Sequence, residues 1–416
     1  MEPDERCRPD PLSQARSIGN RFVDWQAPSG RPDPERCPFV TREPQFVAMN
    51  SHCTQSMARA LYALFERTGE PTYKVAADRY AIFSFIFPRD PVEAFDDRRR
   101  IEWLRRSTDR PLVNNSASYQ YGNALAAYAD FCCFNPSEDG FSARADALFE
   151  WLQTRRTDRG QAYLLGYRPS DPTISDWAFT DDLRLVGSGL VAYFARTGRT
   201  DVLQAAVRLG DYYLRPHVPR TPDGAFVESL GTWCISPWPV TVRIEHLSDV
   251  QLDQAGWGFS ARGVVEFLTR LHARLPVDHP RAELMRDRST RSVRWQFGCQ
   301  FDDGAIGLHA RDDKWLGMTA AALLAYDDIK SVGWVDNAFA AEIDPLAHKA
   351  KEWLIDNVTD EFIDQGGYRA ISGRSRPSPP ENSLWLLAWT IEALLRIEAE
   401  VKSSSYVRET RPCAAE

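Results

Sequence analysis

Several features that would assign this chain to a common class are missing from its sequence. No run of about 18 apolar residues occurs, so no membrane-spanning helix is expected. The first residues, MEPDERCRPDP, lack the basic and apolar regions of a secretory signal. This predicts a cytoplasmic protein, or a periplasmic or secreted one if a signal peptide has been removed. The net charge of −8 and the absence of long basic blocks argue against nucleic-acid and membrane partners.

The eight cysteines form no CxxC pair and no Cys/His spacing typical of a metal site. They are interpreted as reduced, packing thiols, and neither a metal nor a cofactor is predicted. What the chain does contain is apolar surface. Hydrophobic residues make up 43% of the 416 positions, and 13 Trp, 14 Tyr and 21 Phe are among them. This is enough for a large core, and a closed helical ring could hold the whole length in one domain.

An internal repeat indicates how such a ring is built. Residues 60–80, ALYALFERTGEPTYKVAADRY, align without gaps on residues 189–209, GLVAYFARTGRTDVLQAAVRL, and nine of the 21 positions are identical. In each copy an apolar helical pattern ends at Thr-Gly, where glycine suits the left-handed position after a helix. A second helix begins within a few residues, which predicts an antiparallel helical hairpin.

Four further segments fit the same plan. Helical patterns over residues 119–134, 254–275 and 312–329 each precede a more polar helix, and the last helix, from 381, pairs with the N-terminal helix at 10–25. The first helix of each hairpin is small and apolar almost all round, as in a buried inner helix. The sequence therefore predicts an all-α (α/α)6 barrel: six hairpins in an inner and an outer ring. Short strands are expected in the loops at 222–226, 301–307 and 364–370. The predicted domain covers 1–401, and 402–416 are predicted to be a flexible tail.

Two motifs carry a resemblance to a known family. A pair of aspartates, Asp181 and Asp182, opens one inner helix, and QAGWG at 254–258 precedes another. This pattern resembles the (α/α)6 six-hairpin glycosidases, with the nearest likeness to the unsaturated glucuronyl and rhamnogalacturonyl hydrolases. The resemblance implies a sugar site in which Asp182, beside Asp181, acts as general acid/base and Gln254 and Trp257 line the substrate. Shifting Asp181 by the repeat offset leads to His52, where a family member would be expected to carry a second carboxylate.

Inner-helix starts are the expected place for a site. In a closed ring all inner helices run the same way, so their first turns meet at one mouth, where free N–H groups also favour anions. Tryptophans in the mouth would stack on sugar rings, whereas Trp385 and Trp389, four residues apart in a helix, are predicted to be core. The predicted mouth residues are Asn50, His52, Tyr119, Tyr121, Asn123, Trp177, Asp181, Asp182, Trp233, Trp238, His246, Gln254, Trp257, Asp312, Asp313, Trp315, Glu381 and Asn382.

Two reactions fit these residues. Glycoside hydrolysis needs two carboxyl groups, about 5 to 5.5 Å apart for retention or about 6.5 to 9.5 Å for inversion. Asp181 or Asp182 could act with Asp313 or Glu381, and repulsion within an adjacent pair raises one pKa toward that of a proton donor. The same carboxylates could instead simply complement helix dipoles. The first hypothesis is hydrolysis of a uronic-acid-containing oligosaccharide with Asp182 as the principal acid/base.

The alternative is β-elimination on a uronate polymer. It needs a group that neutralises the sugar carboxylate and a Tyr or His that moves the C5 proton, and Asn50, His52, Tyr121 and His246 are the candidates. This reading follows the (α/α)-barrel polysaccharide lyases, which the chain resembles in architecture. A sugar epimerase and a non-catalytic sugar-binding toroid also remain open. A terpene cyclase is disfavoured, because the sequence has neither DDxxD nor DxDD. Either way the predicted partner is an oligosaccharide or polysaccharide.

Overall fold

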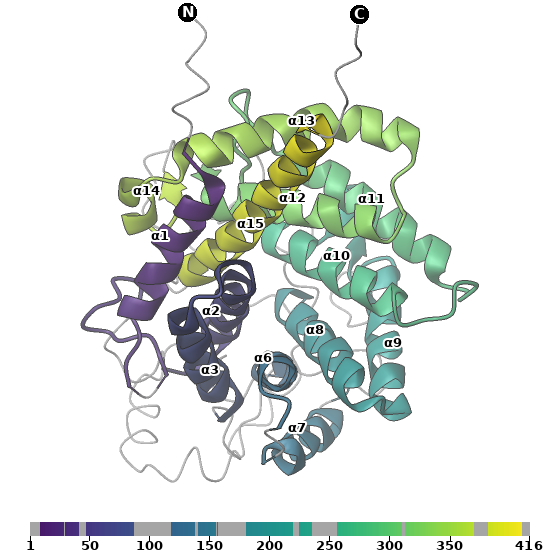
Figure 1. The fold of residues 1–416 in the computed structure, drawn as a ribbon. Coiled ribbons are helices and arrows are strands. Elements are labelled where there is room, and N and C mark those ends of the chain that lie inside the picture. The colour runs from purple at the N-terminus through teal and green to yellow at the C-terminus, as the bar shows by residue number, and fades with distance from the viewer. Residues whose placement is uncertain are drawn as a thin grey trace, which may run out of the picture.

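A computed structural model describes residues 9–28, 30–40, 47–86, 118–137, 140–154, 156, 180–218, 224–234, 256–309, 313–369 and 382–409. Within that part, helices dominate and form two concentric rings (Figure 1). The inner helices are α2 (Val47–Thr68), α6 (Ser118–Phe134), α8 (Thr180–Thr197), α10 (Gly258–His272), α12 (Leu316–Ser331) and α15 (Asn382–Glu409). Their outer partners are α3 (Pro71–Ile86), α7 (Ser142–Thr154), α9 (Thr200–Leu214), α11 (Ala282–Gly298), α13 (Asn337–Asn357) and α1 (Pro11–Asp24). A short helix, α14 (Asp360–Asp364), follows α13.

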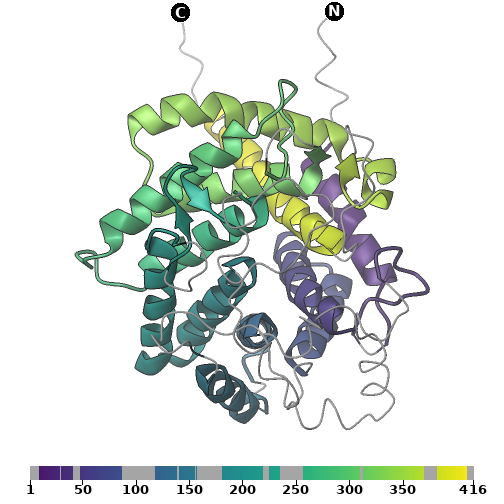
Figure 2. The ribbon, with the colours of Figure 1, turned by 180° about the vertical axis from the view of Figure 1, so that it is seen from behind.

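Each inner helix contacts the next one, and α15 contacts α2, so the inner ring is closed. The view from behind in Figure 2 shows the same ring. The helix before residue 25 and the last helix form the sixth hairpin, because α1 packs against α15. The predicted all-α barrel of six hairpins is therefore confirmed. Helix α15 continues to Glu409, eight residues past the predicted domain end at 401.

Glycine positions explain two local features of the rings. Gly69 and Gly198, which follow the two Thr-Gly helix ends, have φ of 71° and 67°, the left-handed conformation predicted there. Gly122 of α6 and Gly189 of α8 allow two inner helices to approach closely. A Cβ on Gly189 would lie 2.0 Å from the carbonyl oxygen of Gly122, so these two backbones touch only because no side chain separates them.

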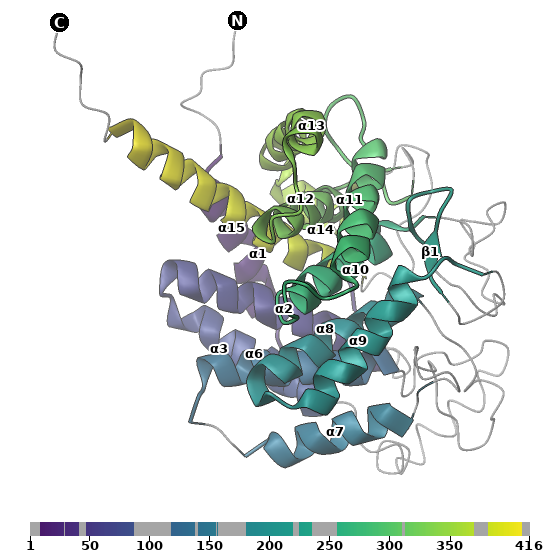
Figure 3. The ribbon, with the colours of Figure 1, turned by 90° about the vertical axis from the view of Figure 1, so that its right-hand side faces the viewer.

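The strands are short; β1 begins in the predicted loop 222–226 and β4 lies in the predicted loop 364–370, whereas their partners β2 and β3 lie outside the predicted loops. Strand β1 (Phe226–Val227) pairs with β2 (Thr232–Trp233), and β3 (Lys314–Trp315) pairs with β4 (Tyr368–Arg369), both antiparallel. Ile306, in another predicted strand loop, makes isolated bridges to Gln300 and Trp315. In the side view α15 runs from the middle of the molecule toward the side opposite β1 (Figure 3).

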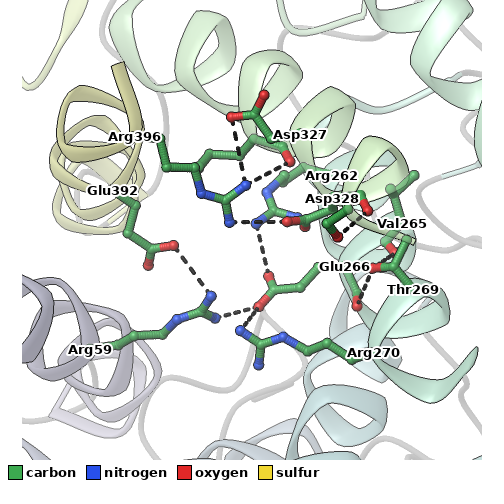
Figure 4. Close-up of polar contacts among 12 residues, drawn as sticks. Arg59, Arg262, Val265, Glu266, Thr269, Arg270, Asp327, Asp328, Glu392 and Arg396 are labelled. Carbon is green, nitrogen blue, oxygen red and sulfur yellow. Dashed lines mark hydrogen bonds and ion pairs between the residues drawn. The ribbon is translucent and has the colours of Figure 1, made fainter. Parts of the chain in front are cut away.

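The inner helices are less apolar than the sequence predicts. Past their first turns, charged side chains from α2, α10, α12 and α15 point toward one another inside the ring (Figure 4). The guanidinium of Arg262 is completely buried and lies 2.6 Å from Asp328 and 3.4 Å from Glu266. Glu266 also pairs with Arg59 and, at 2.8 Å, with Arg270. We call the charged side chains of Figure 4, which are Arg59, Arg262, Glu266, Arg270, Asp327, Asp328, Glu392 and Arg396, the lumen ionic network.

Candidate active site at the starts of the inner helices

Backbone hydrogen bonds hold three inner-helix starts together. The N–H of Gly258, the first residue of α10, donates to Leu308, in the segment that leads to α12, at 2.8 Å. The N–H of Leu316, the first residue of α12, donates to Gly367, in the segment that leads to α15, also at 2.8 Å. The β3–β4 pairing joins the same two segments. These starts therefore lie at one end of the barrel, which we call the mouth.

Side chains then connect helix starts across the ring. Arg184, in the first turns of α8, has its Cζ 4.0 Å from the centroid of the Trp385 ring and 5.6 Å from that of Trp389, both on α15. Phe259 of α10 lies 5.8 Å from each of these two tryptophans, centroid to centroid. The starts of α8, α10 and α15 thus face one lumen. Trp385 and Trp389 are buried, as predicted for core residues, and they pack in that lumen.

The predicted aspartate pair lies at the start of α8. Asp181 and Asp182 are its second and third residues, and their side chains lie outside the described part. An α-helix turns by about 100° per residue. Relative to Arg184, which faces the lumen, position 181 is therefore about 60° around the helix and position 182 about 160°. Of the two positions, 181 is nearer the lumen face.

Asp313 is the predicted carboxylate whose side chain the structure describes. It directly precedes β3 and is only 5% exposed. A carboxylate kept from water at the mouth is suited to a role in acid/base chemistry. The other predicted second carboxylate, Glu381, lies outside the described residues, as does Asp312.

Position 52 lies on the lumen face of α2. It is seven residues, about two turns, before Arg59, which belongs to the lumen ionic network. Position 50 is about 160° around the helix from position 52 and therefore lies on nearly the opposite side of α2. The side chains of Asn50 and His52 lie outside the described part, and so does His246.

Tyr121 packs between the two rings of helices. Its ring stacks on Trp151 of the outer helix α7, with 3.7 Å between the centroids and an interplanar angle of 11°. Tyr119 and Asn123, two residues to either side, are each about 200° around α6. They share their face with Asp130, seven residues after Asn123, which accepts a hydrogen bond from Gln55 of α2. Tyr119 and Asn123 are thus placed on the lumen face, and Tyr121 is directed toward α7.

The predicted tryptophans differ in exposure. Trp257, which precedes α10, is only partly buried, and its ring lies 6.3 Å from that of His309 at an interplanar angle of 20°. Trp233 is fully buried, and its indole N–H donates to the carbonyl of Tyr213 at 2.8 Å. Trp315 is also buried, at the N-cap of α12. Among these three, Trp257 is the one placed to meet a ligand; Trp177, Trp238 and Gln254 lie outside the described residues.

Two mouth residues, Arg184 and His309, were not predicted from the sequence. Arg184 carries the only charge between Leu183 and Ala195 in a buried helix, and this isolated charge was a usable signal. His309 follows the loop 301–307 and gave no such signal, because only the fold brings it beside Trp257.

The opposite end of the barrel is charged but internally compensated. Burial alone would raise the pKa of Glu266, but the charges of Arg270, Arg59 and Arg262 hold that pKa well below its ordinary value. A cleft of about 410 Å³ lies at this end between α2 and α15. Its arginines are already paired with carboxylates, Arg59 with Glu392, Arg67 with Glu398 and Arg396 with Asp328.

Within the described residues, no group of three or more His, Cys, Asp or Glu side chains could hold a metal ion. Nor is any helix of that part long and apolar enough to cross a membrane.

No family model matches the sequence, and no curated protein matches it. Solved structures do match over almost the whole chain. An unsaturated glucuronyl hydrolase from Bacillus sp. GL1 is 14% identical, with 94% of this chain and 97% of that chain covered and a TM-score of 0.58. An α-1,6-mannanase from Salegentibacter sp. HEL1_6 is 10% identical, with 93% of this chain and 100% of that chain covered and a TM-score of 0.57. It was solved in complex with α-1,6-mannotriose, as an inactive variant in which two neighbouring aspartates are replaced by asparagine. A polysaccharide lyase is 14% identical, covers 94% and 98%, and has a TM-score of 0.54.

The chain thus shares the (α/α)6 barrel fold of these solved structures. At these identities the likeness concerns the fold. Because the similar structures include hydrolases and a lyase, the reaction has to be inferred from the residues at the mouth.

Proposed function

We propose that this protein is a glycoside hydrolase that cleaves a uronic-acid-containing oligosaccharide at the mouth of the barrel. The observation that carries the proposal is the position of the Asp181–Asp182 pair. It opens α8, whose next turn places Arg184 in the lumen shared with α10 and α15. The inactive mannanase variant, in which two neighbouring aspartates are replaced, supports assigning the acid/base function to such a pair.

Asp182 is the proposed proton donor, with Asp181 beside it to raise its pKa by like-charge repulsion. The protonated carboxyl gives its proton to the glycosidic oxygen as the bond to the anomeric carbon breaks. In the inverting route, water adds to that carbon while the second carboxylate, for which buried Asp313 is the candidate, accepts a proton from the water. In the retaining route, this carboxylate first forms a glycosyl ester, which water then hydrolyses as the deprotonated Asp182 takes up the proton. Trp257 supplies an aromatic face for a sugar ring. Because position 181 is nearer the lumen face, the two aspartates must be tested separately.

The test is hydrolysis of glucuronate and galacturonate oligosaccharides, measured as new reducing ends. Asp182→Asn is expected to lower kcat by roughly 10²- to 10⁴-fold, because asparagine keeps the shape but has no proton to give. Asp181→Asn is expected to change the pH dependence of kcat more than its maximum. Unchanged thermal unfolding would show that the loss is chemical.

A matched control separates catalysis from helix capping. Asp201 also lies in the first turn of a helix, α9, but on the outer ring, where it is largely exposed and paired with Arg199. Asp201→Asn is expected to leave kcat unchanged. If Asp182→Asn and Asp181→Asn behave like this control, the aspartates only complement the helix dipole and the proposal is wrong.

A lyase reaction is the second candidate, because position 52 is on the lumen face of α2. Elimination forms a C4–C5 double bond, so ultraviolet absorbance would rise during digestion of a uronate polymer, and His52→Ala would stop the rise. The packing of Tyr121 against Trp151 disfavours this candidate, since the tyrosine is directed away from the lumen. Sugar binding without either product would indicate the toroid or the epimerase.

A further inference from the structure

Buried guanidinium groups occur at two levels of the lumen. In the lumen ionic network, Arg262 lies among carboxylates, 2.6 Å from Asp328 (Figure 4). Arg184 is only 2% exposed and lies at the level of the helix starts, over the ring of Trp385. An arginine held over an indole ring is stabilised by the π electrons and keeps its N–H donors at its edge.

The surroundings of Arg184 form a built receptacle. Gly263 of α10 leaves the space that the arginine occupies, because a Cβ there would lie 2.0 Å from Cδ of Arg184 and 2.7 Å from its Nε. Trp385 and Trp389 bound the guanidinium on the side of α15. The side chain is therefore placed by three inner helices, which fixes the direction of its donors.

Arg184 also has the right relation to the proposed acid/base pair. Position 181 is three residues before Arg184, about 4.5 Å away along the helix axis and about 60° around it, so the two positions are neighbours on one side of α8, whereas position 182 is about 160° around. The separation along the axis is comparable with the width of one sugar ring. A ring whose glycosidic oxygen lies on the Asp181 side of the pair can therefore present a substituent to the guanidinium.

We propose that Arg184 determines specificity for acidic sugars by binding the carboxylate of the uronic acid unit next to the cleaved bond. This inference rests on the proposed function. A guanidinium fork matches a carboxylate with two parallel hydrogen bonds, and the low exposure of the site makes that pairing stronger than in water. A neutral sugar offers no carboxylate for this pairing, so the site favours the acidic sugar.

The experiment compares an acidic oligosaccharide with its methyl ester, which has the same shape without the charge. Arg184→Gln is expected to lower kcat/KM for the acid by roughly 10- to 100-fold and to change that for the ester by less than about threefold. Gly263→Ala keeps the arginine but displaces it, so a smaller loss of the same preference is expected. Arg294→Gln, which changes a half-exposed arginine on the outer helix α11, is the control and should leave the preference intact.

Binding separates the two proposals. Titration calorimetry with the Asp182→Asn protein measures the affinity for acid and ester whether or not the wild type hydrolyses either. If no hydrolysis occurs but Arg184→Gln, placed in the Asp182→Asn background, removes the preference for the acid, the function is wrong and the role of Arg184 stands. If the ratio of acid to ester affinity is the same with and without Arg184→Gln and Gly263→Ala, Arg184 is only a structural residue and the inference is overturned.

Discussion

Replacing Arg59 by methionine tests whether the lumen ionic network holds the ring together. Arg59 of α2 pairs with Glu266 of α10 and, at 3.3 Å, with Glu392 of α15, and both carboxylates are more than nine-tenths buried. Removing one partner of a buried ion pair costs about 3 to 5 kcal/mol, because a charge is left uncompensated. Glu266 keeps Arg262 and Arg270, so most of the loss falls on Glu392 and the cost should lie near 3 kcal/mol.

The assay is thermal unfolding followed by far-ultraviolet circular dichroism. With about 2.1 cal/mol/K of unfolding entropy per residue, a loss of about 3 kcal/mol lowers the Tm of this chain by roughly 3 to 4 °C. Arg294→Met is the matched control. Its bidentate pair with Glu342 is half exposed, so its loss should cost at most about 1 kcal/mol, or roughly 1 °C.

A double variant identifies the source of the loss. If the unpaired carboxylate is responsible, adding Glu392→Met to Arg59→Met should restore most of the lost Tm, because a buried pair can be replaced by apolar groups at little net cost. A double variant that is less stable than Arg59→Met, or a single variant as stable as the wild type, would refute this account of the network.

Three further predictions concern packing, pH and substrate. Gly189→Ala should lower the free energy of unfolding, measured by denaturant titration, by about 1 to 3 kcal/mol, because its Cβ would meet the carbonyl of Gly122. The control is Gly298→Ala, in a helix with nothing within 4 Å of the new Cβ, which should raise the free energy of unfolding by up to about 1 kcal/mol. Burial, followed by the charge of a neighbouring histidine, lowers the pKa of His272. The unfolded chain therefore binds the extra proton, and Tm should fall as pH drops below about 6.5; His272→Gln should reduce that fall, and an unchanged pH profile would contradict it. Trp257→Ala should raise KM for the oligosaccharide by roughly threefold to tenfold through lost stacking, with Tm unaffected; an unchanged KM would remove Trp257 from the site.

Local signals sufficed for the architecture. The repeat with its Thr-Gly helix ends identified the hairpin unit, and Gly69 and Gly198 have the backbone conformation that it requires. The meeting of helix starts followed from the geometry of a closed ring. These inferences succeed because a helical hairpin is specified within a short stretch of sequence, such as the 35 residues from Thr180 to Leu214.

Side-chain directions could not be predicted in the same way. The rotation of α6 about its axis, which directs Tyr121 toward Trp151, depends on neighbours far away in the sequence. The contact of Arg184 with Trp385 spans 201 positions and exists only in the closed ring. The burial of the inner-helix charges could not be predicted from the sequence, because arginine and glutamate usually lie at the surface. Arg262 and Glu266 are buried only because the fold brings four inner helices together around them.

The sixth hairpin joins the first helix of the chain to the last, and this has a consequence for biosynthesis. During translation the flank of α2 that α15 will cover stays open to solvent until the final helix emerges. That flank contains the guanidinium of Arg59, and one of its partners, Glu392 of α15, has not yet been translated at that stage. Before α15 is made the inner ring is an open arc in which Arg59 has Glu266 but lacks Glu392, and a chain that stops before α15 is expected to be a substrate for chaperones and proteases.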